Sequence, residues 1–289
     1  INDAHLGRHL IAGIDLVGDA VVTNEFPKRR RLATLKPSEV MKASKWTRRI
    51  AMAKSGRSGD PLLDDDVWKK TQEEIKSEWL RGPFTEDRLK ELLGPLFVIS
   101  RRFGIWQKNA ARVIDDFSES LINAAFGAFE SIDLGGVDEL AILARTLLRM
   151  VADDRSIRVA LSTGEYLEGV LHHSLSVAQA RTLVGRTLDL KSAYKQLLIA
   201  ESSSWAAVIR VFNPAANKDE LFIADALPFG SSASVFGFNR FSRALCRIGI
   251  RLFGLIWTNF YDDFPQLDLA VMGEESKVTA ERLMDLLGW

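Results

Sequence analysis

Three aspartates lie in unusually apolar surroundings, and their positions could support metal-dependent chemistry. Asp189 lies in the strand-like run 187–190, and Asp262 and Asp263 are flanked by aromatic residues. An ionised carboxylate in an apolar setting loses hydration, so it needs a pairing cation or a metal ion. Carboxylates that converge also repel each other, which a divalent cation relieves. Hard oxygen ligands suit Mg²⁺ or Mn²⁺, and two such ions form a clamp for in-line phosphoryl transfer.

Adjacent acids in an ordinary turn are the plain structural alternative. Asp-Asp dipeptides also occur at 65–66, 115–116 and 153–154, so the dipeptide at 262–263 carries little weight by itself. Two other chemistries are poorly supported by the sequence. The pair His172-His173 has no cysteine or acid at zinc-ligand spacing, and there is no Gly-x-Ser-x-Gly segment of the serine-hydrolase kind.

Four short segments, taken in order, resemble the motifs of reverse transcriptases. Residues 185–197 (GRTLDLKSAYKQL) resemble the first palm motif, and residues 227–236 (LPFGSSASVF) resemble the second. Residues 260–264 (FYDDF) resemble the third, the aromatic-x-Asp-Asp element. Upstream, Lys108 and the segment 112–123, which ends in an asparagine, resemble the fingers segment. The similarity covers roughly Leu93–Trp289 and is greatest to retroelement polymerases.

The resemblance implies how the acids would act. Asp189 would be a metal ligand, with the Leu190 carbonyl joining it, and Asp262 would be a second ligand. Asp263 would be a further ligand or a supporting acid. The site would hold two Mg²⁺ or Mn²⁺ ions for nucleotidyl transfer.

The resemblance also implies a nucleotide site. Tyr194 matches the aromatic side chain that blocks the 2′-OH of a ribonucleotide, which favours dNTPs as substrates. Arg112 matches the fingers arginine that lies over the triphosphate, and Lys108 is a looser match. Phe229 and Gly230 match positions that line the nucleotide and the template. Without the family resemblance, each residue has an ordinary structural explanation. Tyr194 would be a half-buried tyrosine, Lys108 and Arg112 would lie on a solvated hairpin, and Phe229 and Gly230 would form a turn.

The chain departs from the family pattern at two positions. Ser234 stands where many relatives carry proline, and Lys277 is a poor match to the lysine of the fourth palm motif. Thumb, connection and RNase H regions are not recognisable. Because the sequence begins without methionine and stops without a polar tail, we expect it to be a fragment of a longer polypeptide.

Hydrophobic periodicity and turn residues predict the elements that would position these side chains. Helices are expected near 68–79, 86–93, 137–150, 231–250 and 277–287, with a break at Gly82-Pro83. Strands are expected over 97–100 and 111–115 around a turn containing Lys108-Asn109, over 157–161 and 166–171 as a hairpin, and over 205–212 and 220–226. The segment 187–200 should start as a strand and turn helical, and 254–264 should hold two strand-like runs. This irregular alternation indicates an α+β fold.

The family resemblance specifies the α+β fold further. It implies a polymerase palm, a small antiparallel sheet backed by helices, together with fingers and without a thumb or RNase H region. We predict a basic N-terminal extension at 1–66, a helical lead-in and fingers at 67–130, and a palm with an inserted hairpin at 131–289. The length of 289 residues is compatible with two domains or one large one.

Charge is distributed unevenly along a chain whose formal net charge is zero. Between Lys28 and Arg57 there are eleven basic residues and one acid, Glu39, which gives this basic block a charge of +10. Such a block can neutralise nucleic-acid phosphates, so we predict that it contacts template or product. A solvated, partly disordered linker is the alternative.

Together these features predict an RNA-directed DNA polymerase that uses dNTPs and an RNA or DNA template with its primer. A catalytically inactive nucleic-acid-binding remnant and an RNA-templated RNA polymerase are the alternatives, and Tyr194 argues against the latter. No apolar run approaches the ~20 residues of a membrane span, and the single cysteine, Cys246, excludes a disulfide framework. We therefore expect an intracellular protein, in the cytoplasm or nucleus, with no membrane partner.

Overall fold

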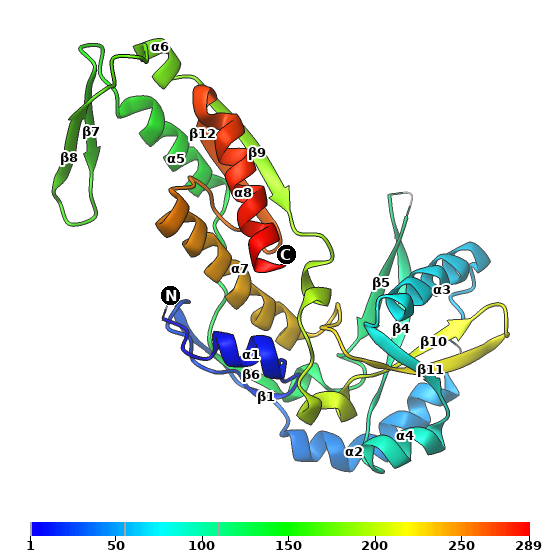
Figure 1. The fold of residues 1–289 in the computed structure, drawn as a ribbon. Helices are drawn as coiled ribbons and strands as arrows, with labels where there is room; N and C mark the ends of the chain where they lie inside the picture. Colours follow the sequence, from blue (N-terminus) through cyan, green and yellow to red (C-terminus); the bar gives the residue numbers. More distant parts are fainter. Residues whose placement is uncertain (1, 55, 109) are drawn as a thin grey trace. The chain divides into compact units, whose positions relative to one another are not determined.

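The computed structural model describes residues 2–54, 56–108 and 110–289 (Figure 1). The fold is α+β, as predicted, with several helices and small sheets. The chain divides into two compact units, which are described separately. The larger unit comprises residues 2–132 and 192–240, and the smaller unit comprises 133–191 and 241–289. The division predicted from the sequence, into 1–66, 67–130 and 131–289, stays a prediction.

The larger unit contains two sheets and the N-terminal helices. Its helices are α1 (Leu6–Ala12), α2 (Pro37–Ala53), α3 (Pro61–Lys76) and α4 (Glu86–Leu93). Its strands are β1 (Gly18–Asp19), β2 (Lys28–Arg31), β3 (Leu80–Phe84), β4 (Ile99–Gln107), β5 (Ala110–Asp116), β6 (Phe126–Glu130), β10 (Val208–Asn213) and β11 (Lys218–Ala224). Short 3-10 helices cover Asn123–Ala125, Ala193–Gln196 and Glu201–Ala206. Strands β1, β6 and β2 form one sheet, with β6 in the middle.

A five-stranded sheet in the order β3-β11-β10-β4-β5 contributes a buried part of the core of the larger unit. Strand β10 runs parallel to β4, and the other neighbours are antiparallel. Helix α3 packs on this sheet because Leu63, Val67 and Thr71 recur at helical spacing and are buried. The predicted helix near 68–79 and the hairpin around Lys108 are confirmed, and Asn109 lies outside the described residues.

Strand β3 contains Gly82-Pro83, the pair that the sequence predicts to end the helix near 68–79. The pair lies in the edge strand of the five-stranded sheet, at a shift in the register between β3 and β11. A proline has no N–H to donate, and an edge position with irregular pairing does not require one. The helix does end before this pair, at Lys76, and the pair itself lies in a strand that the sequence did not predict.

Helix α2 lies inside the basic block, where the sequence showed little periodicity. It folds because Val40, Ser44 and Thr47 form a buried stripe against the larger unit. Arg48 is buried as well; its guanidinium donates to the carbonyl oxygen of Pro95 at 3.0 Å and to that of Phe97. This part of the block is therefore an ordered helix and not a disordered linker.

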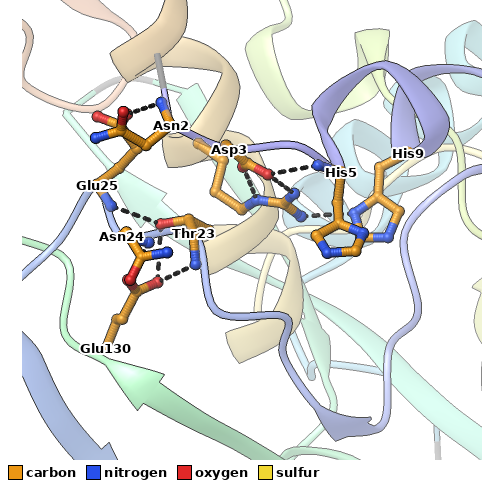
Figure 2. Close-up of polar contacts among 9 residues, drawn as sticks. Asn2, Asp3, His5, His9, Thr23, Asn24, Glu25 and Glu130 are labelled. Atoms are coloured by element: carbon orange, nitrogen blue, oxygen red, sulfur yellow. Dashed lines mark hydrogen bonds and ion pairs between the residues drawn. The ribbon is translucent and has the colours of Figure 1, made fainter.

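Two buried acids anchor the first residues of the larger unit (Figure 2). Arg240 of helix α7 (Ser232–Phe253) donates to the two carboxylate oxygens of Asp3 at 2.7 and 2.9 Å. Glu130 accepts hydrogen bonds from the N–H and the hydroxyl of Thr23, both at 2.8 Å. Burial first, and then the Arg240 charge, lower the pKa of His9, whose Nδ1 lies 2.6 Å from the guanidinium. A neutral His9 can accept this hydrogen bond.

The smaller unit is built around a pair of antiparallel strands. Its strands are β7 (Ser156–Ala160), β8 (Tyr166–Val170), β9 (Leu183–Asp189) and β12 (Asp263–Leu269). Its helices are α5 (Val137–Arg149), α6 (Val177–Ala180), the part of α7 from residue 241, and α8 (Gly273–Leu287), with a 3-10 turn at Ala270–Met272. Strand β9 pairs with β12 and β7 with β8, while α5 and α8 pack on β12. The predicted helices at 137–150, 231–250 and 277–287 and the predicted hairpin are confirmed.

Two segments differ from the prediction. After β9 the chain does not enter an α-helix, because Ser192 takes a left-handed conformation with φ of +59° and only a 3-10 helix follows. Of the two strand-like runs expected over 254–264, isolated bridges at Trp257 and Phe260 remain, and β12 begins at Asp263. Among the described residues, no helix is both long and apolar enough to cross a membrane.

Candidate active site

Strands β9 and β12 bring the first and third motifs together. In the antiparallel register, Asp189 at the end of β9 lies directly opposite Asp263 at the start of β12. The Leu190 N–H donates to the Asp262 carbonyl oxygen at 3.0 Å, so residues 190 and 262 form a hydrogen-bonded pair. Because the two kinds of pair alternate, Asp189 and Asp263 form a non-hydrogen-bonded pair, with Cα atoms typically about 4.5 Å apart. Their side chains therefore leave the sheet on the same face.

Asp262 lies at the tip of a tight turn that leads into β12. Phe260 and Asp263 exchange two backbone hydrogen bonds, of 2.8 and 3.0 Å, which leaves Tyr261 and Asp262 as the two turn residues. Tyr261 has φ of +55° and Asp262 does not have a positive φ, a combination typical of a type II′ hairpin turn. A bulky residue at positive φ costs about 1–3 kcal/mol, and such strain clusters at functional sites.

Two buried polar side chains hold this strained turn. The Ser242 hydroxyl, on helix α7, donates to the Tyr261 carbonyl oxygen at 2.5 Å. It also accepts a hydrogen bond from the Asn259 amide at 3.2 Å, and both Ser242 and Asn259 are buried. Buried polar networks of this kind rigidify what they contact when every member is satisfied. Neither residue was predicted from the sequence, where their only signal is polarity within apolar runs.

The aspartates of the site repel one another. Burial first, and the Asp189 charge second, raise the pKa of Asp263. Burial is also the largest cause of the raised pKa of Asp262; a backbone hydrogen bond, second in size, lowers it, and the charges of Asp189 and Asp263 raise it further. Converging negative charge is the condition that a bound divalent cation relieves.

The donor set fits a hard divalent cation held by two carboxylates. Over the residues that the structure describes, no three His, Cys, Asp or Glu side chains are arranged to hold one metal ion. Mg²⁺ commonly binds through one or two carboxylates and completes its shell with waters and substrate phosphates. Asp189 and Asp263 face each other as such a pair, and Asp262 lies in the adjoining turn.

Most of the residues predicted to bind the nucleotide lie in the larger unit, whereas Leu190 lies with the aspartates in the smaller unit. Tyr194 is buried, with 6% of its surface exposed. Its ring packs against Phe229 and Phe238, with centroid distances of 4.9 and 4.7 Å. Phe229 is 39% exposed, so this aromatic cluster reaches the surface. Packing thus fixes the Tyr194 ring. A fixed ring is expected both of a side chain that blocks the 2′-OH and of a tyrosine that only fills the core.

The loop of the second motif docks on the segment that resembles the fingers motif. Gly230 has φ of +99°, and a Cβ there would lie 2.1 Å from the Asp115 carbonyl oxygen, so only glycine fits. The Asn123 amide donates to the Gly230 carbonyl oxygen, and its side-chain oxygen accepts from the Ser232 N–H, both at 2.8 Å. Asn123, the asparagine that ends the fingers-like segment in the sequence, therefore fixes both sides of this turn.

Lys108 and Arg112 are exposed on the β4–β5 hairpin. Lys108 lies in its turn with φ of +58°, and Arg112 lies on β5 opposite Ile105. Within the described part of the chain, neither side chain makes an ion pair or a hydrogen bond. Their charges are therefore available to a ligand, and a solvated hairpin would look the same.

A buried ion network supports the larger unit and was not predicted. Arg102 donates to both carboxylate oxygens of Asp115, at 2.7 and 3.0 Å, and to Glu74 at 2.9 Å. Lys195, next to Tyr194 in the sequence, also donates to Glu74, at 3.1 Å. Burial by itself would raise the pKa of Glu74, but the Arg102 and Lys195 charges outweigh it and lower that pKa. The network ties α3, β4 and β5 to the C-terminal end of the first motif, through Lys195.

Comparisons with known proteins give matches among solved structures and none elsewhere. No family model matches the chain, and no curated protein matches it. Among solved structures, the chain is similar to the foamy viral protease-reverse transcriptase dRH in complex with double-stranded DNA, with 12% sequence identity and a TM-score of 0.47. The match covers 78% of this chain and 29% of that chain, so this chain spans less than a third of its length. A likeness of this size assigns neither a family nor a function.

Proposed function

We propose that the chain is a reverse-transcriptase-type nucleotidyltransferase, which extends a primer with dNTPs along an RNA or DNA template. One observation carries the proposal: the register between β9 and β12 sets Asp189 opposite Asp263. Either motif alone is common in sequences. Their pairing at one point, beside the strained turn at Tyr261, is not expected of unrelated surface acids.

The three aspartates are the residues that would hold Mg²⁺ or Mn²⁺. When bound, such ions activate the primer 3′-OH and neutralise charge on the phosphoryl group being transferred. The contribution of the chain is to fix the carboxylates beforehand. The β9–β12 ladder sets Asp189 and Asp263, and the turn held by Ser242 sets Asp262. Ligands that are already in place need no reorganisation when substrate arrives.

The larger unit contains most of the side chains that the family resemblance assigns to dNTP binding. In this proposal the packed ring of Tyr194 forms a wall under the sugar, which leaves no room for a 2′-OH. The partly exposed Phe229 and the glycine after it would line the base and template side. Arg112 and Lys108 would neutralise the triphosphate, since both are exposed cations on one hairpin.

A catalytically inactive nucleic-acid-binding remnant is the second candidate. It is favoured by the finding that the described residues include no group of three ligand side chains arranged around one ion. The departures at Ser234 and at Lys277 point the same way. Both candidates predict nucleic-acid binding, and only the first predicts metal-dependent incorporation of dNTPs.

Primer extension separates the two candidates. The purified chain is incubated with a fluorescent DNA primer on an RNA template, dNTPs and Mg²⁺ or Mn²⁺. The proposal predicts extension that EDTA stops and that Asp189→Asn and Asp262→Asn abolish. Asp133→Asn, a change at an exposed aspartate of the same unit, should leave extension intact. Binding of primer–template without any metal-dependent extension would establish the remnant instead, and extension with NTPs alone would indicate an RNA polymerase.

A further inference from the structure

One face of helix α2 is basic and aromatic, and the fold makes no use of it. Lys42, Lys45, Trp46 and Arg49 are all exposed, and Trp46 exposes 63% of its surface. At about 100° per residue, these four positions fall on one side of the helix, opposite the buried stripe that begins at Val40. We call this surface the α2 face.

The cations of the α2 face are not neutralised by the protein. In the described ranges 2–54, 56–108 and 110–289, none of its four side chains makes an ion pair, hydrogen bond or ring contact. The one acid of the basic block, Glu39, lies near the start of the helix, where its carboxylate accepts the Lys36 N–H. Helix α4 behaves differently: Lys90 lies 2.9 Å from Asp87, and Arg88 is also paired along its helix.

An exposed indole between unpaired cations is complementary to single-stranded nucleic acid. Phosphates match the cations, and an unpaired base can stack on the indole, as aromatic side chains do in single-strand binding proteins. The helical rise from Lys42 to Arg49 is roughly 10 Å. An acidic peptide would satisfy the charges and leave the flat ring unmatched. A duplex would offer phosphates and keep its bases stacked internally.

We infer that the α2 face binds single-stranded nucleic acid, with a base stacked on Trp46 and flanking phosphates held by Lys42, Lys45 and Arg49. The binding itself requires no catalysis. It rests on the proposed function only in the identity of the strand, which would then be the unpaired template.

Fluorescence anisotropy with a labelled oligo(dT) tests this site in the full chain. Trp46→Ala should weaken binding by about fivefold to a hundredfold, because base stacking on an aromatic ring contributes in that range. Trp46→Phe should retain most of the affinity, since the ring remains. Replacing the three cations by alanine should flatten the dependence of log K on log salt by about 0.7 for each phosphate that the face no longer neutralises. The double change Lys69→Ala and Lys76→Ala on helix α3 removes two exposed cations elsewhere and should change the affinity far less.

Two results would overturn the inference. Trp46→Ala binding the oligonucleotide as tightly as wild type would show that the ring is not used, and Trp46→Phe failing as badly as Trp46→Ala would exclude stacking. Because Trp46 is exposed, its variants should have the same Tm as the wild type, which circular dichroism verifies.

Primer extension separates this site from the proposed function. If the chain extends no primer and still binds oligo(dT) through Trp46, the proposed function fails and the α2 face stands. If extension is intact and Trp46→Ala changes nothing, the α2 face alone is refuted.

Discussion

Replacing Asp189 by asparagine should stabilise the protein while it removes the proposed chemistry. The substitution keeps the shape of the side chain and deletes one of two like charges that lie opposite each other in the β9–β12 pair. Like charges at directly opposed positions destabilise an antiparallel pair by roughly 0.2–1 kcal/mol. The upper end applies here, because a non-hydrogen-bonded pair brings side chains closest and Asp262 adds its own charge. We therefore expect a gain of about 1 kcal/mol, which raises Tm by about 2–4 °C for a chain of this size.

The pH dependence of this gain has a definite sign. The pKa values of Asp262 and Asp263 are raised in the folded chain, by burial first and then by the Asp189 charge. A carboxyl with a raised folded pKa contributes its stability fully below its unfolded pKa of about 3.9 and loses it as pH rises through the folded pKa. The repulsion is therefore absent in acid and complete at neutral pH. The Tm difference between Asp189→Asn and wild type should be small near pH 4 and should grow toward pH 7.

Thermal unfolding followed by circular dichroism, with EDTA present, measures this difference. Asp133→Asn is the matched control and should show no growth with pH. Adding Mg²⁺ at tenfold over its Kd should then stabilise the wild type by about 1.4 kcal/mol and Asp189→Asn much less. A lower Tm for Asp189→Asn at neutral pH would refute the reasoning, and so would a difference that does not change with pH. Either result would mean that the two carboxylates do not face each other as the register requires.

Three further predictions concern the larger unit. Tyr194→Ala should raise the ratio of kcat/KM for ribonucleotides to that for deoxynucleotides by tenfold or more, about 1.4 kcal/mol per decade, and Tyr194→Phe should not. An unchanged ratio in primer extension would refute the role of Tyr194 as a steric wall. Arg102→Met leaves the buried Asp115 without its ion-pair partner, takes one of two cations from the partly buried Glu74, and should cost about 3–5 kcal/mol in urea unfolding. The exposed Arg88→Met should cost under ~1 kcal/mol, and equal effects would contradict the buried network. Asn123→Ala removes two hydrogen bonds from the second-motif turn and should cost about 1–3 kcal/mol, with faster amide exchange at Ser232; protected exchange in the variant would show that the turn holds itself.

Strong local patterns were sufficient for much of the fold. Helices α3, α5 and α7 carry regular apolar stripes, and the sequence predicted all three within a few residues of one end. Helix α2 escaped notice because its buried stripe contains serine, threonine and arginine, which give a weak hydrophobic period. The basic block then suggested a linker where there is an ordered helix. A buried polar face is thus the case in which periodicity fails.

The candidate site divides in the same way. Sequence motifs located Asp189 and the Asp262-Asp263 pair, yet no local rule decides which of the two lies opposite Asp189. The register decides it, and the left-handed Tyr261 turn fixes where β12 begins. The partners of Arg102 lie 28 and 13 residues away in the chain, so this network has no sequence signature at all.

The placement of charge separates what the fold needs from what it leaves for a ligand. Arg102 and Arg240 are almost fully buried, and each forms close ion pairs with acids inside the larger unit. Breaking such a pair leaves an uncompensated buried charge, so these groups serve the fold. The carboxylates at Asp189 and Asp263 oppose each other, and the cations of the α2 face have no acid beside them. Both arrangements are slightly unfavourable in the free protein, and a ligand of opposite charge relieves each.

Monovalent salt should screen both repulsions. Mg²⁺ should selectively stabilise the site of the aspartates, and single-stranded DNA should selectively stabilise the α2 face. Stabilisation by Mg²⁺ that persists in Asp189→Asn would show that the metal acts elsewhere.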